Sequence, residues 1–532
     1  MKFAPHWRRL ATLLSVLIAL FLLSGLMTVA QDEKVLVIGH AESTDSYDPA
    51  RGYTQTSGIV ERATYETLVT FPNQDASSID PMLADSWEVS ADGLTYTFKL
   101  HDGAVFSSGN PVTADDVVFS FNRMKNVKSS PAFQADNIDS VTATDPQTAT
   151  IVLKTPNPAF LSLLCSAFFS VSDSKVVKEN GGTDAADAET ADAAGAYLDS
   201  HSAGSGPYIL DSWEKQVKTV LVRNPNYQGS REAYFDRVII NNIPEAAAQQ
   251  AALEAGDVDI ALDLTSDQIN ALKGNADISI FSGPGNITHF LLMNKDESIS
   301  GPMADPNVEL AVRYALDYDG YKTLWGGVTP GTNLAVGVAG AFGEDKAFKR
   351  DLDKAKQLLS DAGYPDGFET TLSYPDFTFQ GVNMNTNAQK IQSDLAEAGI
   401  TVKLDVGDLQ TKLEAYRNGQ EGFAYWFWGP DFLDAADFLS FLPGGNVATD
   451  RAGWKPESLS DEVRGWIDQA RVESDPAKRT EIFNQLQDFA QQNSAFAPFN
   501  QPAVQTAFRA NLQGYVWHPQ WLVDVALLSR SA

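Results

Sequence analysis

The chain has 532 residues, a formal net charge of −30 and 43% hydrophobic residues. This length exceeds one ordinary hydrophobic core and predicts two or more lobes. The hydrophobic content indicates a folded protein, and the negative charge argues against nucleic acid or anionic lipid as a partner, because like charges repel.

The first thirty residues predict a secretory signal peptide. Lys2, Arg8 and Arg9 form a basic start, an apolar run spans 10–27, and the small residues Thr28 and Ala30 precede a predicted cleavage point. The apolar run is close to membrane-spanning length, so an uncleaved anchor is the alternative. No cysteine follows the run, and a lipoprotein is therefore not predicted.

From residue 34 onward the sequence predicts strands and helices in alternation. Residues 34–39 (KVLVIG) predict a buried strand, and 59–68 have apolar residues at helical spacing. Residues 94–100 (LTYTFKL) alternate between apolar and polar, which is typical of a half-buried strand. Thr113 and Asp116 have the spacing of a capping box at the start of a helix.

The later segments predict further helices followed by strands. Residues 182–197 are rich in Ala and Asp and predict a solvated surface insertion. Gly256 and Gly399 each end a predicted helix before a predicted strand, while Asp305 and Pro306 begin another helix. Repeated helix-then-strand units predict an α/β fold.

The stretch FAYWFW places five aromatic residues shortly before Asp431. It is either a core strand or the wall of a binding pocket with an acid at its end. In a strand, alternate side chains point to opposite faces. Either Tyr425 and Phe427 or Trp426 and Trp428 would then face a cleft, and we favour the tryptophans.

The usual signatures of catalysis and metal binding are not visible. The chain has one cysteine, Cys165, in an apolar run where we expect it to be buried, and its six histidines form no close pair. We find no nucleophile elbow and no P-loop. The sequence therefore predicts no cofactor, no metal and no enzymatic activity.

Residues 81–123 resemble the signature of a known family. This segment, PMLADSWEVSADGLTYTFKLHDGAVFSSGNPVTADDVVFSFNR, is similar to that of the extracytoplasmic solute-binding proteins of peptide-type ABC transporters, bacterial solute-binding protein family 5. The segments AALEAGDVDIA, PNVELAVRYALDYD and AKQLLSDAGYPDGF follow in the family's order. The resemblance covers nearly the whole mature chain.

The resemblance implies a two-lobed α/β fold that closes on its ligand by hinge motion. It implies a first lobe at 31–287 with a subdomain inserted at about 54–195, a second lobe at 288–499, and a return to the first lobe at 500–532. The implied protein is a secreted monomer, periplasmic or at the cell surface. It binds a solute and delivers it to an ABC permease.

A di- or oligopeptide is the ligand that the family implies by default. The tryptophans keep an oligosaccharide or another small solute as the alternative, because aromatic faces stack on sugar rings. A secreted glycoside hydrolase is a remote alternative, with Asp431 and Asp434 as its pair of carboxyl groups.

The resemblance also implies ligand contacts. Asp431 matches an aspartate that anchors the α-amino group of a bound peptide, and residues 425–429 would run beside the ligand. Arg417 roughly matches an arginine that meets the ligand carboxylate, and Tyr53 and Thr54 lie in a loop that resembles a cleft-lining loop.

Asn294, near a crossover strand, is a weaker candidate for a ligand contact. Each candidate also has a plain structural interpretation. Asp431 can begin a turn, Trp428 can belong to a core, Arg417 can end a helix, and Asn294 can bond the end of a strand.

Overall fold

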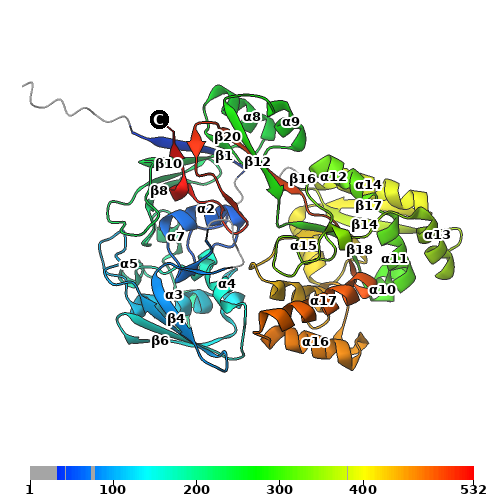
Figure 1. Cartoon of the computed structure of the whole chain (residues 1–532), viewed down its shortest axis with the longest axis horizontal. Coiled ribbons are helices and arrows are strands. Elements are labelled where there is room, and N and C mark those ends of the chain that lie inside the picture. The colour runs from blue at the N-terminus through cyan, green and yellow to red at the C-terminus, as the bar shows by residue number, and fades with distance from the viewer. Residues whose placement is uncertain (1–32, 42–43, 73–77, 380–381, 532) are drawn as a thin grey trace, which may run out of the picture.

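The computed structural model describes residues 33–41, 44–72, 78–379 and 382–531. The predicted signal peptide lies outside these ranges. Within them, no helix is both long enough and apolar enough to cross a membrane. Figure 1 shows two bodies side by side, which we call the first and second lobes.

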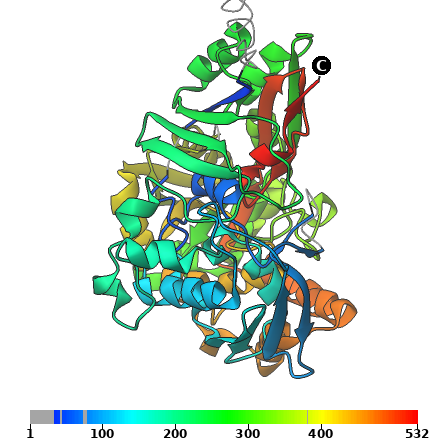
Figure 2. The ribbon, with the colours of Figure 1, turned by 90° about the vertical axis from the view of Figure 1, so that its left-hand side faces the viewer.

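The first lobe is built on a seven-stranded mixed sheet. In sheet order its strands are β12 (Ile278–Pro284), β20 (Ala503–Arg509), β11 (Ile260–Ala261), β1 (Val35–His40), β10 (Arg237–Asn242), β9 (Lys218–Arg223) and β8 (Tyr208–Glu214). Its helices include α2 (Gln55–Thr64), α8 (Ala246–Ala255) and α9 (Ser266–Leu272). β20 comes late in the chain and pairs with β11 and β12, which come much earlier. Figure 2 shows red C-terminal segments beside green ones.

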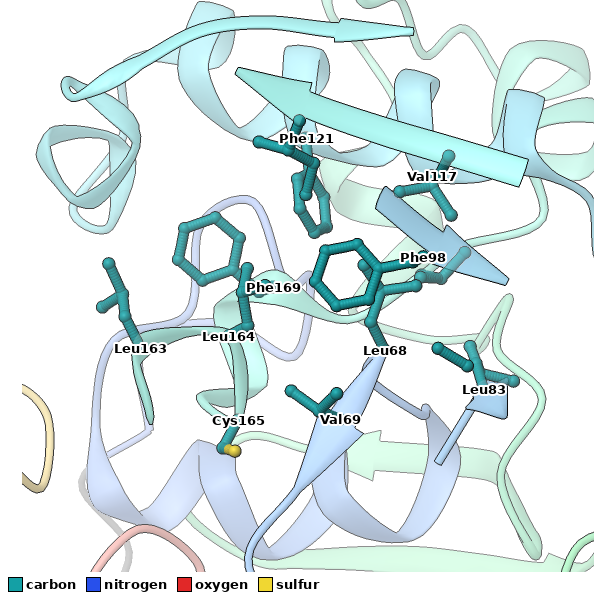
Figure 3. Close-up of a cluster of buried hydrophobic side chains, with 14 of the residues drawn as sticks. Leu68, Val69, Leu83, Phe98, Val117, Phe121, Leu163, Leu164, Cys165 and Phe169 are labelled. Carbon is teal, nitrogen blue, oxygen red and sulfur yellow. The ribbon is translucent and has the colours of Figure 1, made fainter. Parts of the chain in front are cut away.

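A four-stranded antiparallel sheet with its own core extends the first lobe. Its order is β4 (Ala84–Val89), β5 (Thr95–Leu100), β7 (Thr148–Leu153) and β6 (Ile138–Asp145), accompanied by α3 (Ala114–Val127) and α4 (Phe160–Leu164). Phe98, Phe121 and Phe169 come together in the core of this part (Figure 3). Cys165 is buried beside them as predicted, and burial raises the pKa of its thiol.

The second lobe is built on a five-stranded sheet covered by helices on both faces. Its order is β17 (Ile400–Gly407), β14 (Phe368–Pro375), β18 (Phe423–Trp428), β13 (Thr288–Met293) and β19 (Phe496–Asn500). The helices are α11 (Pro306–Ala315), α12 (Tyr318–Trp325), α13 (Leu352–Asp361), α14 (Met384–Ala398), α15 (Leu409–Arg417), α16 (Asp461–Val472) and α17 (Pro476–Asn493). All six residues of β13 are buried, as expected for a central strand.

Short elements complete the two lobes. They are α5 (Ser174–Glu179), α6 (Ala188–Ala191), α7 (Gly195–Leu198), α10 (Glu297–Ser300) and the two-residue strands β2 (Val69–Thr70), β3 (Asp80–Pro81), β15 (Thr378–Phe379), β16 (Val382–Asn383), β21 (Leu512–Gln513), β22 (Trp517–His518), β23 (Leu522–Val523) and β24 (Ser529–Arg530).

The chain crosses between the lobes twice, and the two crossovers lie against each other. It leaves the first-lobe sheet between β12 and β13 and returns between β19 and β20. The Gly285 N–H donates to the Pro502 carbonyl at 3.0 Å, and the Gln501 side-chain amide donates to the Gly285 carbonyl at 2.6 Å. Adjacent crossovers suit a hinge. The domain limits implied by the family resemblance stay predictions.

Local sequence signals placed several helix ends correctly. The Asp116 carboxylate accepts from the Thr113 N–H at 2.9 Å, at the start of α3. Asp305 caps α11, whose first residue is Pro306. Gly256 and Gly399 end α8 and α14 at φ 83° and 106°, a left-handed conformation that favours glycine.

One expectation of local structure was wrong, and a second holds only in part. Helix α2 ends at Thr64, and Leu68 lies beyond it, buried beside β2 in the core of the four-stranded part. The segment 182–197 is not simply solvated, because the Asp192 side chain is fully buried and binds Arg123 at 2.7 Å. Arg123, which is distant in the sequence, holds Asp192 in an ion pair inside the fold, and composition alone does not show such a contact.

Candidate ligand-binding site

A cavity of about 250 Å³ lies between the two lobes. The first lobe contributes the loop before α2, one face of α2, a short segment near α4 and part of the C-terminal region, and the second lobe contributes the end of β18 and the turn after it. The lining residues are Gly52, Tyr53, Thr54, Gly58, Glu61, Ala167, Phe168, Ile287, Phe427, Gly429, Pro430, Asp431, Pro519 and Gln520.

A hydrogen bond between Tyr53 and Asp431 joins the two lobes across this cavity. The Tyr53 hydroxyl donates to Asp431 Oδ1 at 2.8 Å and accepts from Gln134 Nε2 at 2.9 Å. The rings of Phe133 and Phe168 pack against the Tyr53 ring, with centroids 5.7 and 5.6 Å away. The first lobe therefore holds the tyrosine in place, and its hydroxyl points at the acid of the second lobe.

The electrostatics of Asp431 favour a cationic partner. Burial raises the pKa of its carboxyl group, while the Tyr53 hydrogen bond and the positive charge of Arg451 lower it. The Arg451 guanidinium lies over the Trp428 ring, 5.3 Å from its centroid. A carboxylate in a water-poor cavity attracts an ammonium group more strongly than a surface carboxylate does.

Asp437 supports the turn that carries Asp431. Asp437 Oδ1 accepts from the Asp431 N–H at 3.3 Å, and its Oδ2 accepts from Trp428 Nε1 at 3.2 Å. Asp437 is buried. Its burial, and to a smaller extent the nearby charge of Asp431, raise the pKa of its carboxyl group well above the usual value. Of the two acids, Asp431 is the one that faces the cavity.

The orientation of the aromatic strand differs from the one we favoured. β18 has a neighbouring strand at each edge and a hydrophobic core on each face, and its first four residues are buried. Trp426 packs in the second-lobe core and donates to Glu421 Oε2 at 2.6 Å, and Trp428 packs against the same core. Tyr425 is also buried, and Phe427 on its face lines the cavity. The ligand space therefore lies beyond the carboxyl end of the strand, a common place for it in α/β sheets.

Comparison with known proteins identifies the family. The family described as bacterial extracellular solute-binding proteins, family 5, matches residues 78–450. The chain belongs to this family.

Curated family 5 relatives match along most of their length. The probable D,D-dipeptide-binding periplasmic protein DdpA of Escherichia coli K12 is 28% identical over 507 residues, covering 92% of this chain and 93% of the relative. The glutathione-binding protein GsiB of Shigella flexneri serotype 5b is 26% identical over 529 residues, covering 94% and 96%.

A solved structure shares the fold. The periplasmic binding protein DppA of Helicobacter pylori, in complex with the peptide STSA, is 26% identical and has a TM-score of 0.75. The match covers 94% of this chain and 99% of that one. The two-lobed α/β fold expected for a family 5 protein is thus confirmed.

Of the other expected contacts of a family 5 site, one lines the cavity and two lie elsewhere in the structure. Thr54 lines the cavity and caps α2 by accepting from the Ser57 N–H at 3.3 Å. Arg417 is exposed at the last residue of α15 and does not line the cavity. Asn294 is buried after β13 and donates to the Glu421 carbonyl at 3.2 Å, which is the plain structural interpretation. The structure does not bring these two residues to the cavity.

Several lining or supporting residues were not found by sequence reasoning. Glu61, Phe168, Gln134 and Asp437 carry no motif, and only the folded chain brings them to the cavity or its walls. Asp437 had one available signal, because it follows Asp431 by six residues in an acidic segment. Asp434, the acid that the glycoside hydrolase alternative pairs with Asp431, forms an ion pair with Arg479 inside the second lobe.

Proposed function

We propose that this protein is the peptide-binding component of an ABC importer. It works as a monomer outside the cytoplasmic membrane and delivers its ligand to a membrane permease. The observation that carries the peptide assignment is the Asp431 carboxyl group, which faces the cavity between the lobes. The names of the relatives support it, because they mention a D,D-dipeptide and glutathione, and the solved relative holds the peptide STSA.

In the proposed mechanism, Asp431 binds the free α-amino group of the peptide. The lobes open at the two crossovers, the ammonium group enters, and the Tyr53 hydroxyl shares or yields its place on the carboxylate. Closure then surrounds the ion pair and removes water from it, which strengthens the attraction. Phe427 and Phe168 offer apolar surface on opposite walls to a peptide side chain.

The alternative ligand, an oligosaccharide, loses its main argument. That argument rested on tryptophan faces in the binding wall, and neither Trp426 nor Trp428 lines the cavity. A glycoside hydrolase is also disfavoured, since the family consists of solute-binding proteins and Asp434 is held by Arg479. Periplasmic relatives support an extracytoplasmic location.

The proposal is tested by identifying the ligand. Mass spectrometry of material released from the purified protein should find peptides, and the same peptides should raise the melting temperature by mass action. Asp431→Asn should weaken binding by about 1.5–3 kcal/mol, the range for hydrogen bonds to charged groups. Asp102→Asn, a matched change at an exposed acid of the first lobe, should leave the affinity unchanged. Equal affinities for all three proteins would remove Asp431 from the site.

A further inference from the structure

Glu61 brings a second acid to the wall of the same cavity. It lies on α2 of the first lobe, whereas Asp431 belongs to the second lobe, and both line the cavity. The Glu61 residue is only 3% exposed, and within the described ranges its Oε1 has no hydrogen-bond partner. An unsatisfied buried carboxyl group is unfavourable for folding, so its presence at a cavity points to a partner outside the chain.

The backbone of Gly52 lies close to one carboxyl oxygen of Glu61. Gly52 passes so close that a Cβ at that position would lie 2.5 Å from Glu61 Oε1. The backbone of the loop before α2 therefore covers the acid on one side. Glu61 is also one of the residues that line the cavity.

The surroundings of Glu61 are strongly negative. Burial and the charges of Asp45, Asp48 and Asp199 all raise the pKa of its carboxyl group. Asp48 is neutralised by Arg123 at 2.7 Å. Asp199, by contrast, accepts from the Ser46 hydroxyl at 2.5 Å and the Tyr47 N–H at 2.9 Å, and neither donor is charged. This wall therefore attracts positive charge.

The described part of the cavity lining has no basic side chain, and its ionisable groups are few. They are Glu61, Asp431 and Tyr53. Two acids on opposite lobes can each take one donor from a ligand that lies between them. A single α-amino group engages Asp431 and leaves Glu61 free for another group.

We propose that the ligand carries a second cationic group, which Glu61 binds from the first lobe while Asp431 binds the α-amino group from the second. The preferred ligand class is a short peptide with a basic side chain near its amino terminus. This inference rests on the proposed function and narrows it. Glu61 is then a specificity-determining residue, since it contacts the side chain and not the group common to all peptides.

The test compares lysine with norleucine, which has a similar aliphatic chain but no ammonium group. Affinities are measured calorimetrically for Lys-Ala-Ala, Ala-Lys-Ala and their norleucine counterparts. The wild-type protein should prefer lysine by about tenfold or more at one of the two positions, the effect of one charge-assisted hydrogen bond. In Glu61→Gln this preference should fall to less than about threefold, while the norleucine peptides keep their affinity.

Two controls make the outcome decisive. Glu254→Gln, a matched change at an exposed acid of α8, should keep the lysine preference. Norleucine peptides binding to Glu61→Gln show that the variant is folded, and Glu61→Ala, which also removes the charge, replaces it if it does not fold. The inference is overturned if peptides bind through Asp431 but the lysine preference is absent or survives in Glu61→Gln. If Asp431→Asn leaves binding unchanged, the proposed function fails instead.

Discussion

Asp431 and Asp437 belong to one short segment, yet their surroundings give them different tasks. Asp437 is buried and accepts two hydrogen bonds from the chain itself, from the Trp428 indole and the Asp431 N–H. Asp431 faces the cavity and accepts from Tyr53, a residue of the opposite lobe. One acid therefore shapes the turn, and the other is available to a ligand.

The Tyr53 hydroxyl should set the pH range in which Asp431 binds an ammonium group. Burial raises the pKa of Asp431, and the hydrogen bond from Tyr53 lowers it again. Binding requires the carboxylate, so affinity is present above this pKa and is lost as pH falls through it. Tyr53→Phe removes the hydroxyl, which raises the pKa of Asp431 further. We expect the acid midpoint of peptide affinity to move to higher pH.

The measurement is a titration of Ala-Ala-Ala affinity against pH for wild type and variant. Tyr96→Phe is the matched control, because the Tyr96 hydroxyl donates to the Asn157 carbonyl within the four-stranded part of the first lobe. Its midpoint should coincide with that of wild type. An unchanged midpoint in Tyr53→Phe would show that the hydroxyl does not stabilise the Asp431 carboxylate.

At the scale of the element, the position of β18 in its sheet decides the roles of its aromatics. A strand with neighbours on both sides and helices over both faces offers no side to a cleft. Only its carboxyl end opens toward the first lobe, where Phe427 lines the cavity. Of two adjacent residues in this strand, Trp426 therefore stabilises the second-lobe core and Phe427 is available to a ligand.

Two neighbouring substitutions in β18 should affect different properties, one the stability of the fold and the other peptide affinity. Trp426→Phe removes the indole N–H that donates to Glu421 and should lower the free energy of unfolding by about 1–3 kcal/mol, the penalty for a buried acceptor that loses its donor. Phe427→Ala removes cavity surface and should weaken peptide binding. Denaturant unfolding and calorimetry separate the two effects. A loss of peptide affinity in folded Trp426→Phe would contradict this assignment.

Local elements were predictable from the sequence, and their relative placement was not. The caps at Asp305 and Gly399 depend on neighbours a few residues away, which the sequence displays directly. The alternation of β18 was also correct, since it follows from strand geometry alone. Which face meets the ligand depends on the strands beside β18, and these come from distant parts of the chain.

In the candidate site, too, some residues could be predicted from the sequence and others could not. Tyr53 and Asp431 were found because a family resemblance covers their segments, and the structure brings them together at 2.8 Å. Glu61 had no such signal. Its burial, its unpaired oxygen and its acidic neighbours appear only after folding, because Asp45, Asp48 and Asp199 come close to it from separate parts of the chain.

For the whole molecule, the turn after β18 links ligand binding to closure of the lobes. Asp431 accepts from Tyr53, and two residues later Leu433 joins a buried cluster whose other members come from the first lobe. Phe432 packs against the same cluster. An open form would return these side chains to water, so their burial favours the closed form.

Leu433→Ala should therefore shift the balance between open and closed forms. Leucine burial is worth about 1.5–3 kcal/mol, and most of that difference should fall on closure rather than on folding. Because the ligand is enclosed only in the closed form, its affinity should decrease about tenfold. Calorimetry with Ala-Ala-Ala gives the affinity, and small-angle scattering should show a larger radius of gyration in the unliganded variant.

The matched control is Leu439→Ala. Leu433 and Leu439 are 7% and 8% exposed, but Leu439 packs within the second-lobe core. Its truncation leaves a cavity inside one lobe, so it should lower the melting temperature and leave the affinity and the radius of gyration unchanged. Leu433→Ala should lower the affinity and enlarge the radius of gyration, with a smaller effect on the melting temperature. If both variants lose stability equally and neither changes affinity, Leu433 has no role in closure, and the contacts across the cleft do not govern binding.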